Sequence, residues 1–141
     1  MARVKIQLPE NWLFAIELPV RITDINYGRH LGNDSLLALL QEARVRWLQQ
    51  FGWTEFIGET TGLIMVDLAV RFKSEAVFGD TLRIELAATE WTDFGFDLIY
   101  RVTKTDGGAE VARAKTGMVF FDYSTHRVTG LPPYFRAKIG A

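Results

Sequence analysis

The chain has 141 residues, 48% of them hydrophobic and 23% charged, which is typical of one globular domain with a real core. Its formal net charge is −1 and it has no run of Lys or Arg, so nucleic acid is not expected as a partner. Cysteine is absent and there are only two histidines, which excludes disulfides and leaves little to build a metal site from.

No apolar run approaches the ~20 residues that cross a bilayer, so we expect no membrane partner. The N-terminus also lacks the apolar core of a signal peptide. We therefore predict a cytoplasmic protein whose residues 1–141 form a single domain without a metal.

Two short strands are predicted at the start of the chain. Residues 3–8, RVKIQL, alternate between polar and apolar side chains and predict the first. Residues 12–22, WLFAIELPVRI, predict the second, and Pro19 within it indicates an edge strand or a bulge.

A long amphipathic helix is predicted next. Asn33 and Asp34 mark its start, because Asn, Asp or Ser can cap free helix N–H groups, and Gly52 marks its end. At 100° per residue, about half of its circumference is apolar. This arc holds Leu36, Leu37, Leu39, Leu40, Ala43, Trp47, Leu48 and Phe51.

Charged residues on this helix have structural interpretations. Glu42 and Arg46 lie one turn apart on the polar side and are predicted to form an ion pair. Arg44 falls inside the apolar arc, where we expect a structural ion pair rather than a contact with a coenzyme.

The rest of the chain predicts strands, with a hairpin turn at TDGG and a final short helix near Pro133. The strands cover residues 62–72, 80–91, 95–105 and 109–123. A strand, a buried helix and at least four antiparallel strands predict an α+β fold in which a curved sheet wraps one central helix.

Some strands carry apolar residues on both sides, as in Phe120 with Phe121 and Leu98 with Ile99. A second copy could cover the outer face, so we predict a homo-oligomer. Asp67 is isolated in an apolar strand and is interpreted as a solvent-facing residue. The alternative is a catalytic carboxylate, if that strand borders the helix start of a partner.

Residues 20–48, VRITDINYGRHLGNDSLLALLQEARVRWL, resemble the hotdog-fold thioesterases of the 4-hydroxybenzoyl-CoA thioesterase type. The family pattern V-R-x-x-D-x-D-x-x-G-H-V-N-N matches at Asp24, His30 and Asn33. The resemblance implies an antiparallel sheet of five or six strands around the helix. It also implies a homodimer or dimer of dimers with active sites at the subunit interface, and acyl-CoA or acyl-carrier thioesters as substrates.

Three positions depart from this pattern. The second Asp of D-x-D, commonly the catalytic carboxylate of the family, is Asn26 here, and an amide cannot act as a base or nucleophile. At the family position of the glycine before the histidine, this chain has Arg29, and at the position of the first Asn of N-N it has Gly32. Either another carboxylate serves, or the protein orients water, or it only binds.

The catalytic candidates are Asp24, Asn26 and His30. The substrate-binding candidates are Gly32, Asn33 and Asp34 at the helix start, where free N–H groups suit a developing oxyanion. Each candidate also has a structural interpretation, such as capping a turn, starting the helix or holding the loop.

The predicted function is hydrolysis of an acyl-CoA or acyl-carrier thioester to free acid and thiol. No cofactor is expected, since coenzyme A enters as part of the substrate. One alternative is a non-catalytic acyl-thioester binding protein, which Asn26 keeps open. The other is a hotdog hydratase or dehydratase. Those enzymes carry the pattern D-x-N-x-x-H, and the sequence DINYGRH is close to it but has one residue too many.

Overall fold

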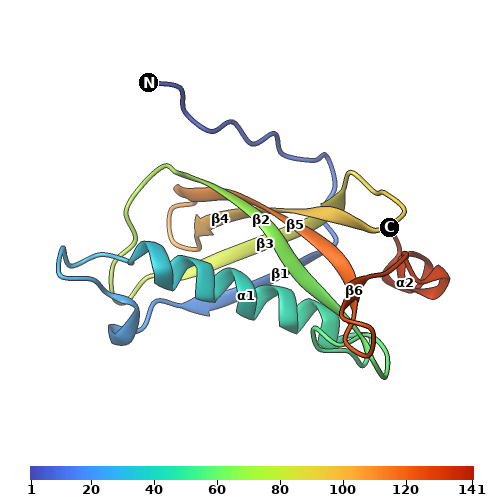
Figure 1. Ribbon diagram of the computed structural model, residues 1–141. Coiled ribbons are helices and arrows are strands. Elements are labelled where there is room, and N and C mark those ends of the chain that lie inside the picture. Colours follow the sequence, from blue (N-terminus) through green and yellow to red (C-terminus); the bar gives the residue numbers. More distant parts are fainter.

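The computed structural model describes residues 1–141 and contains one antiparallel sheet in the order β1-β3-β4-β5-β2, with β6 paired to β5. Helix α1 lies across one face of the sheet, and α2 lies near the end of β5 (Figure 1). The strands are β1 (Phe14–Pro19), β2 (Thr61–Phe72), β3 (Thr81–Thr89), β4 (Gly95–Lys104), β5 (Glu110–Asp122) and β6 (Arg127–Val128). The helices are the 3₁₀ turn η1 (Ile22–Asp24), α1 (Asn33–Gln49) and α2 (Pro133–Ile139).

The core lies between α1 and the inner face of the sheet, which confirms the predicted α+β arrangement. Leu36, Leu40 and Trp47 of α1 are at most 1% exposed, and they pack in one cluster with alternate residues of β3, β4 and β5. Burial of each leucine stabilises the fold by roughly 1.5–3 kcal/mol. Neither helix combines the length and apolar character that spanning a membrane requires.

The predicted ion pairs of α1 are both present. Arg46 donates to Glu42 at 2.6 Å on the exposed side. Arg44 is buried, with its Nε 3.6 Å from the Glu55 carboxylate, and its Nη1 donates to the Tyr100 hydroxyl at 3.1 Å. Burial raises the pKa of Tyr100, which keeps this hydroxyl neutral in the core.

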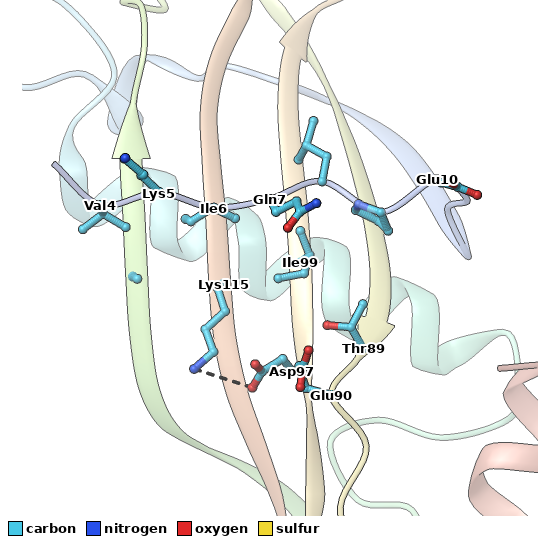
Figure 2. Close-up of a pocket in the computed structure, with 13 residues that line it drawn as sticks. Val4, Lys5, Ile6, Gln7, Glu10, Thr89, Glu90, Asp97, Ile99 and Lys115 are labelled. Atoms are coloured by element: carbon cyan, nitrogen blue, oxygen red, sulfur yellow. Dashed lines mark ion pairs between the residues drawn. The ribbon is translucent and has the colours of Figure 1, made fainter.

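The N-terminal segment is not the strand that residues 3–8 predicted. It runs extended across the outer face of the sheet, over the strands rather than beside one (Figure 2). Arg71 of β2 and Arg113 of β5 donate to the carbonyl oxygens of Val4 and Ile6, both at 3.3 Å. A segment that crosses strands cannot join their backbone ladder. Its alternation therefore does not mark a paired strand.

This segment also covers part of the outer face that was expected to meet a second copy. Ile99 is only 8% exposed and lies beneath the segment (Figure 2). Phe121 packs edge-on against Tyr123, with 5.0 Å between the ring centroids. The outer face of a single chain thus accounts for both residues, and oligomerisation stays a prediction that needs other support.

Candidate active site at the start of helix α1

Asp24 holds the loop that leads into α1. It is 3% exposed, and its carboxylate accepts from the Arg21 backbone N–H at 2.8 Å and from the Arg21 guanidinium at 3.1 and 3.3 Å. Burial works to raise the pKa of Asp24, but the hydrogen bonds and charge of Arg21 outweigh it and hold that pKa below its ordinary value. A saturated carboxylate of this kind is a poor base, so the geometry favours the structural interpretation of Asp24.

Asn26 serves the same loop. Its side-chain oxygen accepts from the backbone N–H of Gly28 at 3.0 Å, and its carbonyl accepts from Arg29 at 3.0 Å. Hydrogen bonds of this kind are typical of Asx turns. Arg29 follows with φ of 69°, in the left-handed region that favours glycine.

His30 leaves this loop toward α1 and remains partly accessible, with 35% of its side chain exposed. Its Nδ1 lies 3.4 Å from the Leu31 carbonyl oxygen, and its Nε2 lies 3.8 Å from a carboxylate oxygen of Glu75. The backbone N–H of Leu31 donates to the Ala76 carbonyl at 2.8 Å, which holds the two loops side by side.

The start of α1 differs from the prediction, because no side chain caps it. The residue that precedes the first helical turn is Gly32, so Asn33 and Asp34 lie inside that turn. The first helical bond runs from Leu36 N–H to the Gly32 carbonyl, and no backbone or side-chain acceptor meets the N–H groups of residues 33–35. These donors, at the positive end of the helix dipole, remain available to a ligand.

Gly32 leaves room for the Asp34 side chain at the helix start. A Cβ at this position would lie 2.7 Å from the Asp34 carboxylate, and the Gly32 N–H already donates to the Asp24 carbonyl at 3.0 Å. The Gly32 N–H is therefore occupied. Of the predicted substrate-binding residues, Asn33 and Asp34 are the ones whose N–H groups are free.

Two cavities flank the helix start. One, of about 280 Å³, is lined by His30 and Asn33 together with Lys73, Ser74 and Glu75 and several apolar residues. The other, of about 300 Å³, lies between α1 and β2, with Asp34 at one end and Arg44 among its lining residues. Asn33 and Asp34, whose N–H groups are free, thus each line one of these two open cavities.

A larger cavity, of about 510 Å³, lies on the opposite face of the sheet beneath the N-terminal segment (Figure 2). Lys115 there lies 3.5 Å from Asp97, whose pKa is raised because burial outweighs the charge of the lysine. The sheet separates this cavity from α1, so it takes no part in the site at the helix start.

Asp67 belongs to that outer face as well. Its carboxylate is 2.7 Å from Lys115 Nζ and accepts from the Gly117 N–H at 3.0 Å, and its side chain is 60% exposed. The solvent-facing interpretation of Asp67 therefore fits these contacts. No three His, Asp or Glu side chains gather in the way a metal site would require.

Glu75 is the residue that sequence reasoning missed. It lies in the loop after β2 and reaches His30 only because that loop is bonded to Leu31. No local pattern around position 75 distinguishes it from an ordinary exposed glutamate.

Comparison with known families identifies this fold. The family model of the thioesterase-like superfamily matches residues 20–139. The chain belongs to this superfamily. This membership confirms the relationship expected from residues 20–48 and supports the expected reaction class, thioester hydrolysis. No curated protein matches the sequence.

Solved thioesterase structures share the fold. Slr0204, a 1,4-dihydroxy-2-naphthoyl-CoA thioesterase from Synechocystis, superposes with a TM-score of 0.82 at 22% identity, over 90% of this chain and 95% of that one. PA2801, a putative thioesterase from Pseudomonas aeruginosa, gives 0.83 at 24%, over 92% and 99%. BH1999, a gentisyl-coenzyme A thioesterase, gives 0.77 at 21%, over 87% and 99%. The predicted hotdog fold is thereby confirmed.

Proposed function

We propose that this protein hydrolyses an acyl-CoA thioester to a free acid and the coenzyme A thiol at the start of α1. The observation that carries the proposal is the uncapped helix start, where the N–H groups of residues 33–35 are free and Asn33 lines a cavity together with His30. The superfamily match supports the reaction class. The two structures named for dihydroxynaphthoyl-CoA and gentisyl-CoA make hydroxylated aromatic acyl-CoAs the first substrates to test.

The chemistry follows from these free donors. When water attacks a thioester carbonyl, negative charge develops on its oxygen, and fixed N–H groups at the positive end of a helix stabilise that charge. The reaction consumes water and needs no cofactor, because coenzyme A is part of the substrate. We assign the main donor to the Asn33 N–H, since Asn33 lines the same cavity as His30.

Thiol release from a panel of aromatic, short and long acyl-CoAs tests the proposal, with Asn33→Pro compared with Asn33→Ala. Relative to alanine, proline removes the backbone N–H, and the first helical position tolerates its ring. The preceding Gly32 is extended, with φ of −71° and ψ of 154°, a conformation compatible with a following proline. We expect Asn33→Pro to lose about 100–1000-fold in kcat relative to Asn33→Ala.

Equal activities of the two variants would contradict this donor assignment.

A second candidate function, acyl-thioester binding without hydrolysis, is favoured by Asn26. Its amide stands at the position of the usual family carboxylate and accepts a hydrogen bond from the Gly28 N–H. Binding of the acyl-CoA panel, measured by calorimetry, without release of thiol from any member would establish that alternative.

We also propose a homodimer that forms through β2, and we place it in the cytoplasm. β2 ends the sheet, and Met65, Leu68 and Phe72 on the side facing α1 are 47%, 38% and 50% exposed. A second β2 paired along this edge would cover them and satisfy the free edge of the ladder. Leu68→Glu should give monomers in light scattering, whereas Val128→Glu in β6 should not. A monomeric wild type would contradict the dimer.

A further inference from the structure

We propose that His30 is the general base that activates water in this site, and that Glu75 is a positioning residue that acts through it. The inference rests on the proposed hydrolysis and supplies the group that Asn26 cannot provide. Asn26 is an amide engaged by Gly28, and Asp24 is saturated by Arg21. Asp34 lines the other cavity.

The contact of His30 with the Leu31 carbonyl favours one tautomer of the ring. Its Nδ1 lies 3.4 Å from the Leu31 carbonyl oxygen, and a carbonyl can only accept a hydrogen bond. In the tautomer that donates to this carbonyl, Nδ1 carries the proton of the neutral ring and Nε2 keeps its lone pair. Nε2 is thus the nitrogen available to take a proton from water.

Glu75 is placed to stabilise the protonated ring. Its Oε1 lies 3.8 Å from Nε2, and the bond from Leu31 N–H to the Ala76 carbonyl, at 2.8 Å, fixes its loop beside His30. Lys73, the other charged residue that lines the cavity, is 3.1 Å from Glu110 and so is already paired. From β5 and α1, the cavity receives only Val111, Asn33 and Leu36, which are uncharged.

The reaction balances with these groups alone. His30 Nε2 removes a proton from water while the water oxygen bonds to the thioester carbon, and the carbonyl electrons move to the oxygen held by α1. The tetrahedral intermediate re-forms its carbonyl, the carbon–sulfur bond breaks, and the leaving thiolate takes the proton from Nε2. The products are a carboxylic acid and a thiol, and neutral His30 is regenerated.

Chemical rescue tests the role of His30. We expect His30→Ala to lose about 100–10,000-fold in kcat, the usual contribution of a general base. The site opens onto a cavity of about 280 Å³, so added imidazole should enter and restore part of the rate. A histidine that only holds the loop would give a variant that imidazole does not rescue, and this result would overturn the inference.

The pH profile tests the role of Glu75. Glu75→Gln removes the charge that favours the protonated ring, so the acidic limb of kcat/KM should move to lower pH. Its kcat should fall several-fold with little change in KM, and Glu75→Asp should restore part of it. Glu42→Gln, which removes an equal charge from the exposed side of α1, should leave the profile unchanged.

Two results would overturn the role of Glu75 while leaving hydrolysis intact. An unshifted profile in Glu75→Gln would show that the carboxylate does not act on His30. A loss as large as that of His30→Ala would make Glu75 itself the base. The proposed function fails separately, since in that case wild type would release no thiol from any acyl-CoA.

Discussion

Two neighbouring polar regions of one short loop and helix start behave in opposite ways. Between Arg21 and Gly28, the side chains of Asp24 and Asn26 are bonded to Arg21 and to the backbone. From His30 to Ser35, the helix has no side-chain cap, its first N–H groups are free, and a cavity adjoins them. Side chains that are bonded within the motif therefore build the loop, whereas groups left without a partner can face a ligand.

The energetic reason is the same in both regions. A buried polar group without a partner costs about 1–3 kcal/mol, so a buried carboxylate such as Asp24 is retained only with its partners. The N–H groups at the start of α1 avoid that cost only if water or a ligand reaches them. The first region should therefore respond to mutation in stability, and the second in activity.

The largest stability effect is expected at Asp24. Asp24→Asn keeps the shape but loses the charge, and its new NH₂ group faces the Arg21 donors. We expect the free energy of unfolding to fall by about 2 kcal/mol, because hydrogen bonds to charged groups are among the strongest. Denaturant unfolding beside Asn33→Ala, which should change it by less than about 0.5 kcal/mol, measures the contrast. Similar losses of unfolding free energy in both variants would contradict the expected difference between the two regions.

The pH dependence of stability is a second test of the contribution of Asp24. The pKa of Asp24 is lower in the folded protein than its ordinary value, so the unfolded chain binds the proton first as pH falls. The stabilisation by Asp24 is complete above the ordinary aspartate range near pH 4 and is lost as pH falls through the folded pKa. Wild type should therefore lose more stability between pH 5 and pH 3 than Asp24→Asn does. Parallel curves would show that Asp24 does not carry this dependence.

Much of the fold was predictable because its signals are local. The apolar period of residues 36–51 predicted α1, and the alternation of four later segments predicted β2 to β5. Gly52, with φ of 80°, ends the helix as expected. The prediction of a strand at residues 3–8 was wrong, because a segment that lies across a sheet can show the same alternation as a strand within it.

The site was only partly predictable. The loop residues around His30 were identified, but which of them are saturated depends on contacts that residue types do not reveal. Asn33 and Asp34 have the chemistry of caps, yet the chain enters the helix at Gly32, which leaves them in the first turn. Glu75 comes from a distant loop, and only the pairing of Leu31 with Ala76 brings it to His30.

Gly28 lies where the two regions meet, so a substitution there tests whether this position affects activity or stability. A Cβ there would lie 3.2 Å from both Asn26 Oδ1 and His30 Nε2. The partly exposed imidazole can yield more easily than the bonded amide, so Gly28→Ala should displace His30. We expect kcat to fall about tenfold while stability changes by less than about 1 kcal/mol. Gly130→Ala, whose Cβ would meet only the Asp93 carbonyl at 3.7 Å, is the control. A loss of stability without loss of activity would show that Gly28 belongs wholly to the first region.

The smallest effect is expected at Arg29, where a side chain occupies a backbone conformation suited to glycine. Its φ is 69°, and left-handed conformations cost most residues about 1 kcal/mol. Arg29→Gly removes this strain but gives the unfolded chain more freedom, so the net gain in stability should be only a few tenths of a kcal/mol. Arg29→Ala is the matched control, because alanine loses the same long side chain and keeps the strain. Denaturant midpoints should therefore rank glycine above alanine at this position. The reverse order would mean that the loop imposes no strain at Arg29, and that the glycine of the family pattern serves some purpose other than this turn.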